Sequence, residues 1–233
     1  MINLKCDAVL PECDMKPLED IENSITAEYK KSIWAKFLKA VNEFGLVKDG
    51  DKIAIAISGG KDSLLLYKLF QRLKKDKRRN FEFRAVNLNP GFKKEDLDNF
   101  KNNLLKLDID CEIFDTNIWK IANEKAKDYP CFLCAKMRRG ILYKKVEEYG
   151  YNKLALGHHF DDVIETTLIN IFYSGSVKTM TPEVDSTSGK LKVIRPLIYV
   201  EEKDIINYTK KNGILAMNCG CTIEAGKTSS KRK

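Results

Sequence analysis

Apolar residues along this chain recur at two spacings, and together they predict alternating helices and strands. Residues 24–44 carry apolar side chains at every third or fourth position, which is typical of an amphipathic helix. Residues 52–57 form a nearly continuous apolar run, as in a strand buried on both faces. The same spacings predict strands over 81–88, 109–114 and 153–156 and helices over 63–73, 93–107, 138–149, 162–172 and 201–210. This alternation predicts an α/β fold, a mainly parallel sheet with helices on both faces.

Three stretches fall outside the alternation. The first ~25 residues have the loop signals of an irregular arm. Residues 177–197 predict a hairpin or an excursion, and residues 218–233 form a Cys-, Ser- and Lys-rich tail. A length of 233 residues suits one α/β domain. We therefore expect an N-terminal arm and helix over 1–45 and a single domain with a basic tail over 46–233.

Composition indicates a partner and a compartment. The chain has 41 lysines and arginines against 33 aspartates and glutamates, and its net charge of +8 favours a polyanionic partner. A hydrophobic content of 43% excludes a disordered chain, and no apolar run approaches the ~18 residues of a membrane span. The start has no secretory signal, so we expect a cytoplasmic protein with reduced thiols. Grouped cysteines then favour metal binding or catalysis over disulfides.

A polar segment after the first predicted strand has the composition of an anion site. Its residues are Ser58, Gly59, Gly60, Lys61, Asp62 and Ser63, and a helix is predicted to follow. Glycines allow positive φ angles and let backbone N–H groups converge, and a helix N-terminus adds its dipole. The hydroxyls and the Lys61 ammonium add further donors. The alternative is a strand-to-helix turn that uses glycine for geometry alone.

Two pairs of cysteines form the second feature. Cys131 and Cys134 make a C-x-x-C pair, which can share a metal, a cluster or a disulfide. Cys219 and Cys221 form the other cluster of cysteines. Four thiols could build a structural zinc site, whereas three could hold a [4Fe–4S] cluster with one iron open for chemistry. The alternative for Cys131 and Cys134 is that both are plain buried thiols.

The third feature is Gly157-His158-His159-Phe160-Asp161-Asp162, which joins a predicted strand to a predicted helix. In parallel sheets, ligands and Mg²⁺ are expected at the carboxyl ends of the strands. Asp161 and Asp162 are therefore candidate metal or catalytic residues. The alternative is that one of them merely caps the helix.

The first segment resembles the PP-loop of the ATP-pyrophosphatase superfamily, whose hallmark is Ser-Gly-Gly-x-Asp-Ser. The three segments together, in this order and spacing, resemble the tRNA 2-thiolation enzymes, namely the tRNA 2-thiocytidine and 2-thiouridine synthetases. Segments that resemble the thiocytidine type are 89–92, 138–143, 172–175 and 194–197. The resemblance covers roughly residue 35 to the end. It implies an adenine nucleotide alpha hydrolase-like fold with its catalytic domain in residues 46–233.

The resemblance implies an ATP and Mg²⁺ site. The pyrophosphate portion and Mg²⁺ would be held by Ser58, Gly59, Gly60, Asp62 and Ser63, with Lys61 as an electrostatic partner of the phosphates. The remaining ATP-binding residues would be Ala56, Ile57, Leu88, Asn89, Gly157 and His158. Asp161 would be catalytic, as a Mg²⁺ ligand or proton acceptor, and Arg138 would lie near the cluster and the reacting base.

The resemblance further implies an oxygen-sensitive [4Fe–4S] cluster on three cysteines. Cys131 and Cys134 match the first two ligands. Cys221 is expected to be the third, because it lies at the thiouridine-type distance from Gly226-Lys227-Thr228-Ser229, and Cys219 is the alternative. The chain departs from the thiocytidine type in having C-x-C there, and it lacks the flanking zinc-binding cysteine pairs of the thiouridine type.

The implied reaction adenylates the C2 oxygen of a flipped-out tRNA pyrimidine, releases pyrophosphate, and then replaces that oxygen with sulfide held on the open iron while AMP leaves. The partners would be tRNA, an external sulfur donor (a cysteine desulfurase or sulfide) and an electron donor, and the chain is a candidate homodimer. Basic runs at 74–79 and 227–233 are candidate tRNA contacts. The alternatives are another RNA-directed PP-loop enzyme, of the 4-thiouridine or lysidine type, and a zinc-stabilised non-catalytic RNA-binding module.

Overall fold

The computed structural model describes residues 9–125 and 130–217, apart from the side chains of residues 123 and 130–132. It contains a six-stranded sheet in which every neighbouring pair is parallel except the last. The strands, in spatial order, are β3 (Cys111–Asp115), β2 (Glu82–Asn89), β1 (Lys52–Ala56), β4 (Lys153–Ala155), β6 (Lys192–Ile194) and β5 (Glu183–Asp185). The predicted α/β class with a mainly parallel sheet is confirmed.

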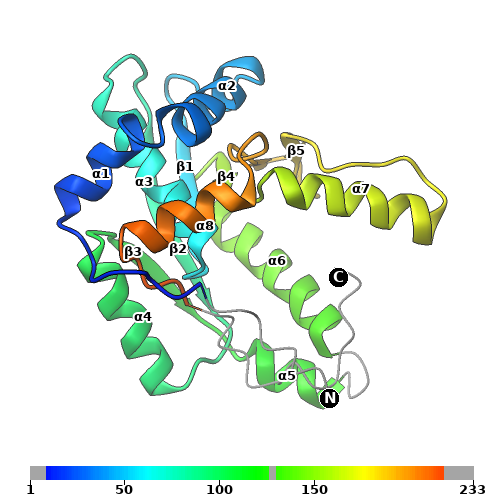
Figure 1. The fold of residues 1–233 in the computed structure, drawn as a ribbon. Helices are drawn as coiled ribbons and strands as arrows, with labels where there is room; N and C mark the ends of the chain where they lie inside the picture. The colour runs from blue at the N-terminus through cyan, green and yellow to red at the C-terminus, as the bar shows by residue number, and fades with distance from the viewer. Residues whose placement is uncertain (1–8, 126–129, 218–233) are drawn as a thin grey trace.

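Helices cover both faces of this sheet (Figure 1). One buried cluster joins Ile53 and Ile55 of β1 to α1 (Leu18–Thr26), the π-helix η1 (Lys30–Trp34), α2 (Ala35–Glu43), α3 (Lys61–Lys75), α4 (Lys94–Lys106) and α8 (Glu202–Lys211). A second cluster joins Ala54 to α5 (Ile118–Lys125) and α6 (Pro130–Glu148). Successive residues of β1 belong to opposite clusters because side chains alternate along a strand, which explains its continuous apolar run.

Several elements differ from the predictions. The predicted helix over 24–44 is instead α1, η1 and α2, and α1 begins at Leu18, inside the stretch expected to be irregular. The π-turn accounts for the break, because the amides of Tyr29 and Trp34 each donate to the carbonyl five residues earlier. Helix α5 was not predicted, and α6 begins at Pro130 rather than at residue 138. The 177–197 stretch contains the β5–β6 hairpin, and β6 joins the main sheet beside β4.

The strand order places a switch point between β1 and β4. From β1 the chain crosses to β2 on one side, and from β4 it crosses to β6 on the other. The carboxyl ends of β1 and β4 therefore flank a crevice in which parallel sheets bind ligands. Helix α7 (Phe160–Ser174) starts beside this point and extends away from the body of the molecule (Figure 1). No helix within the described residues has both the length and the apolar character needed to cross a membrane.

Candidate nucleotide and catalytic site

The loop between β1 and α3 is held in one shape by its own serines. The Ser63 hydroxyl donates to the Gly60 carbonyl at 2.8 Å and accepts from the Ser58 amide at 3.2 Å. The Gly60 amide donates to the Ser58 hydroxyl at 3.3 Å. Gly60 is the N-cap of α3, so the loop ends at the positive end of a buried helix. These hydrogen bonds fix the shape of the segment predicted to be an anion site.

Gly59 could not be replaced by a larger residue. Its φ of +88° lies in the left-handed region, and a Cβ there would lie 3.2 Å from the Phe100 ring and 3.3 Å from the Met217 Cβ. The Gly59 carbonyl also accepts a hydrogen bond from the Met217 amide at 2.9 Å. The loop is thus braced from outside by α4 and by the segment that follows α8.

The His159 side chain lies between the first turns of α3 and α7. Its ring is buried, and its nitrogens lie 3.8 Å from Asp62 of α3 and 3.6 Å from both Asp161 and Asp162 of α7. Asp162 and His159 also form a capping box at the start of α7. The capping alternative for Asp162 is thus realised. Asp161 lies in the same cluster, and its Oδ2 accepts from the Glu202 amide at 2.7 Å.

Glu202 is a site residue that sequence reasoning did not identify. Its Oε1 lies 2.8 Å from Lys61 Nζ, which also lies 3.2 Å from Asp62. Glu202 begins α8, about 140 positions after the loop in the chain. The only signal in the sequence was an acidic pair in the first turn of the last predicted helix. The Lys61 amine is therefore held by one carboxylate of its own helix and by one from α8.

Burial and nearby positive charges have opposite effects on the pKa of Asp62. Burial raises the pKa of the Asp62 carboxyl above its usual range, and the nearby Lys61 and His159 only partly offset this rise. For Lys61, burial lowers the pKa, but Asp62 and Glu202 outweigh it and the net direction is upward. Asp62 Oδ1 is buried and accepts no hydrogen bond from the described residues, although Lys61 Nζ lies 3.2 Å from it. A divalent cation beside this oxygen would further offset the cost of burying the carboxylate.

These carboxylates fit Mg²⁺ as a partly protein-bound ion. Among the described residues, no group of three or more His, Cys, Asp or Glu side chains is arranged as a complete metal site. Mg²⁺ commonly takes one or two carboxylates and completes its shell with water and substrate phosphates. Asp62 and Asp161, predicted as Mg²⁺ ligands, both lie around His159 beside the PP-loop.

Gly157 allows the two helix starts to approach. A Cβ at this position would lie 3.1 Å from the Asp62 carbonyl carbon and from the Ser63 amide nitrogen. This close approach gives the predicted Gly157 a place beside the loop. His159 lies among the carboxylates, and His158, which is predicted to bind ATP, is half-buried next to Gly157 in the chain.

Four of the residues predicted to bind ATP lie at the carboxyl ends of β1 and β2. Ala56 ends the first strand and Ile57 follows it, and Leu88 and Asn89 end the second. The Asn89 carboxamide is engaged within the chain. Its oxygen accepts from the amides of Gly91 at 3.0 Å and Phe92 at 2.7 Å, and its nitrogen donates to Asp115 at 2.8 Å. Asn89 therefore shapes the loop that follows β2.

A cavity of about 140 Å³ connects the PP-loop to α6. Its lining residues are Ser58, Gly60, Pro90, Phe92, Trp119, Arg138 and Met217. Pro90 and Phe92 come from the loop that Asn89 shapes, and together with Trp119 and Met217 they form the apolar part of the lining. Arg138 of α6 therefore lines the same cavity as Ser58 and Gly60 of the loop.

The structure describes only some of the cysteines that were predicted to bind a cluster. Cys134 is buried on α6, in the cluster that also contains Phe114 and Trp119. Cys131 lies three residues earlier on the same helix, which puts both residues on one helical face. The side chain of Cys131 and all of Cys219 and Cys221 lie outside the described residues. A buried thiol one turn from a second cysteine fits a cluster ligand pair, in a helix whose Arg138 lines the cavity.

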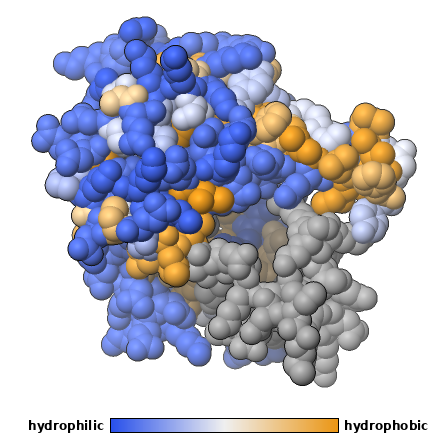
Figure 2. All heavy atoms as spheres, viewed as in Figure 1, coloured by the Kyte–Doolittle hydropathy of each residue, from blue (hydrophilic) through white to orange (hydrophobic). Residues whose placement is uncertain are grey.

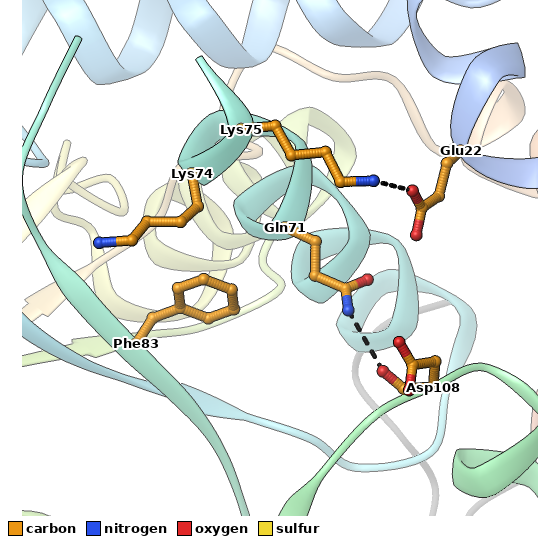
Figure 3. A pocket seen from close by; sticks show the side chains of 6 residues that line it. All are labelled: Glu22, Gln71, Lys74, Lys75, Phe83 and Asp108. Carbon is orange, nitrogen blue, oxygen red and sulfur yellow. Dashed lines mark hydrogen bonds and ion pairs between the residues drawn. The ribbon is translucent and has the colours of Figure 1, made fainter. Parts of the chain in front are cut away.

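A larger cavity, of about 330 Å³, lies at the opposite end of α3 (Figure 3). Several of its polar groups bond to one another or to nearby backbone, although the buried Gln71 Oε1 accepts no hydrogen bond from the described residues. Lys75 pairs with Glu22, the Gln71 amide donates to the Asp108 carbonyl at 3.2 Å, and Lys74 donates to the Phe81 carbonyl. It has none of the converging loop amides found at the other end of the helix, so volume alone does not make it a site.

Sequence comparisons with known proteins identify a family and relatives that are similar to this chain. A family model described as a PP-loop domain matches residues 29–217. The chain is 39% identical over 197 residues to a tRNA-cytidine(32) 2-sulfurtransferase of Syntrophotalea carbinolica, covering 84% of this chain and 76% of that protein. It is 38% identical to the protein of the same name from Citrifermentans bemidjiense, covering 84% and 77%.

One solved structure has a similar fold and a related activity. It is the U34-tRNA thiolase NcsA from Methanococcus maripaludis with its [4Fe-4S] cluster. The match has a TM-score of 0.67 and 25% sequence identity, and it covers 84% of this chain and 68% of that one.

Proposed function

The chain belongs to the PP-loop domain family as a tRNA sulfurtransferase, and we propose that it thiolates a tRNA cytidine at C2 after activating the base with ATP. The observation that carries the proposal is the preformed PP-loop with the Asp62 and Asp161 carboxylates beside it. The relatives named for cytidine 32 support that base and position, whereas the solved thiolase acts on U34.

In this proposal the chain first binds and orients ATP. The loop amides and the N-terminus of α3 would receive the β- and γ-phosphates, because converging N–H groups and a helix dipole favour anions. Lys61, now shared by Asp62 and Glu202, would turn toward the phosphates. Asp62 and Asp161 would hold Mg²⁺, which would neutralise charge on the leaving pyrophosphate.

In the next steps the base would be activated, and its C2 oxygen would be replaced by sulfur. The C2 oxygen of a flipped-out cytidine would attack the α-phosphorus, forming an adenylated base and releasing pyrophosphate. Arg138, which lines the cavity next to the loop, would position this base. Sulfur would then replace the activated oxygen at C2, and AMP would leave. When bound to Cys131, Cys134 and a C-terminal cysteine, a [4Fe–4S] cluster would supply the site for that sulfur, delivered with electrons by external donors.

The test is in vitro thiolation of a tRNA transcript with ATP, Mg²⁺, sulfide and a reductant under anaerobic conditions. We expect 2-thiocytidine by nucleoside mass spectrometry, with AMP and pyrophosphate in equal amounts. A Cys134→Ala variant should still release pyrophosphate while it loses sulfur transfer. Lysidine or 4-thiouridine as the product would replace the proposal. Stoichiometric zinc without iron binding would favour the RNA-binding module.

A further inference from the structure

Residues 213–217, which we call the strap, run from the end of α8 to the PP-loop. At its start Gly213 has a φ of +68°, and a Cβ there would overlap the Asp14 carbonyl, so the strap begins tightly packed against the N-terminal arm. In Figure 1 the red end of the ribbon lies beside this dark blue arm. Ile214 and Ala216 are buried, and Figure 2 shows hydrophobic side chains reaching the surface below α8. The path of the strap is therefore fixed by packing from its first residue.

A buried carboxamide holds the middle of the strap. Asn103 of α4 is 6% exposed, and its Nδ2 donates to the Leu215 carbonyl at 2.7 Å. The other buried residues of this helix are the apolar Phe100 and Leu104. Burying a carboxamide costs free energy unless it forms hydrogen bonds, so the contact with the strap accounts for an asparagine at this position.

The end of the strap binds a peptide group of the PP-loop. The Met217 amide donates to the Gly59 carbonyl at 2.9 Å. The N–H of the same peptide group belongs to Gly60 and donates to the Ser58 hydroxyl within the loop. Because a trans peptide is planar, its carbonyl and its N–H point in opposite directions. Rotation of this peptide, which the glycines permit, would break the bond to the strap and turn the N–H out of the loop at the same time.

The strap leads directly toward the C-terminal cysteines. Met217 lines the 140 Å³ cavity together with Arg138, which lies one turn after Cys134 on α6. An extended chain advances at most ~3.6 Å per residue, so the Cα of Cys219 can lie no more than roughly 7 Å from that of Met217, and the Cα of Cys221 no more than roughly 14 Å. Whichever of these two cysteines is the third cluster ligand, the end of the strap limits where it can be.

We propose that the strap couples nucleotide binding to cluster binding, with Asn103 as the positioning residue that keeps the strap docked. The shared element is the peptide between Gly59 and Gly60, because phosphates on the loop amides and the docked strap favour the same orientation of it. The strap would be held at its other end when a C-terminal cysteine ligates the cluster together with Cys131 and Cys134. By linkage, each ligand then raises the affinity for the other by the same factor. This inference rests on the proposed function, since it requires that the chain binds both ATP and the cluster.

The wild-type full chain provides the first test. Calorimetry under anaerobic conditions measures the dissociation constant of a non-hydrolysable ATP analogue with Mg²⁺, for iron-free protein and for protein reconstituted with iron and sulfide. The reconstituted form should bind the analogue at least about fivefold more tightly, which is the lower end of typical coupling between sites. Equal affinities of the two forms would overturn the proposal.

Asn103→Leu tests the positioning residue, because leucine has a similar branched shape but no donor for the Leu215 carbonyl. The ratio of the two dissociation constants should fall to about one. Asn102→Leu is the matched control, since Asn102 is the exposed neighbour on the same helix, and it should keep the wild-type ratio. A loss of stability in Asn103→Leu with an unchanged ratio would mean that Asn103 only supports the fold, and would overturn its role.

Release of iron to a chelator, followed by absorbance, measures the coupling from the side of the cluster. The ATP analogue should slow this release several-fold in the wild type and in Asn102→Leu, and should have no effect on it in Asn103→Leu. Protection by the analogue that persists in Asn103→Leu would contradict the proposal.

The outcomes separate this inference from the proposed function. A protein that thiolates tRNA but binds the nucleotide equally well with and without the cluster would retain the function and lose the coupling. A protein that shows the coupling but releases no pyrophosphate in the presence of tRNA would retain the coupling and lose the proposed function.

Discussion

Helices α3 and α7 can be compared because they have the same length and because the first turn of each lies beside His159. Each spans 15 residues, and each begins with a turn whose aspartate faces His159. Beyond that turn they differ. Nine residues of α3 are buried in the core, whereas α7 buries none. The first turn of a helix can therefore lie at the candidate site whether or not the rest of the helix is packed into the core.

The largest expected effect tests the shared first turns. Asp62→Asn and Asp161→Asn should each lower the rate of tRNA-dependent pyrophosphate release by about 10²–10³-fold, since each removes a carboxylate proposed to hold the Mg²⁺ that neutralises the leaving pyrophosphate. Asp110→Asn, on an exposed carboxylate far from the loop, is the control and should leave the rate unchanged. If only one of the site variants lost activity, the two turns would not share a role.

The next largest effect concerns stability, and it compares the parts of α3 and α7 that follow their first turns. Leu69→Ala in α3 should lower the free energy of unfolding by about 2–5 kcal/mol, because Leu69 is fully buried. Leu168→Ala in α7 should change it by no more than about 0.5 kcal/mol in the monomer. Urea unfolding at low protein concentration, where association contributes least, measures both. Equal losses would contradict the difference between the helices.

Gly157→Ala tests the contact between the two starts. The added Cβ would press on the backbone of Asp62 and Ser63, and we expect a loss of stability of about 1–3 kcal/mol. Binding of a non-hydrolysable ATP analogue should weaken as well, since the same backbone forms the cradle. Gly140→Ala is the matched control, because a Cβ there meets no atom within 4 Å and its φ is not positive, and it should not lower stability. Unaltered nucleotide affinity would separate Gly157 from the cradle.

The smallest effect tests Glu202 as a positioning residue. Glu202→Gln should raise the KM for ATP about tenfold, equivalent to ~1.4 kcal/mol, because Lys61 would lose an ionic partner that orients it. The kcat should change less. Glu201→Gln is the matched control, as its carboxylate pairs with Lys36 and Lys203 instead. The same KM shift in both variants would mean that α8 acts only through folding.

The sequence alone was sufficient to predict the parts of the site that are contiguous in the chain. The segment 58–63 carries its own glycines and hydroxyls, so its cradle could be inferred before any packing was known. The contact of Glu202 with Lys61 could not be inferred in this way. It forms only because α8, from a distant part of the chain, packs beside the loop. Similarly, three-residue β6 is a strand mainly because β4 and β5 lie beside it. The spacing of α7 predicted a helix but could not tell a core-facing surface from an outward one.

The two edges of the sheet bear on how copies of this protein meet. At one edge β3 is bordered by Asp110 and contains Glu112 and Asp115, and at the other β5 contains Glu183 and Asp185. Carboxylates along an edge strand oppose the addition of strands from another molecule. Sheet-to-sheet growth, which has no natural end and leads to aggregates, is therefore disfavoured at both edges. The charges on these two edge strands therefore bear on the solubility of the protein as well as on the shape of its sheet.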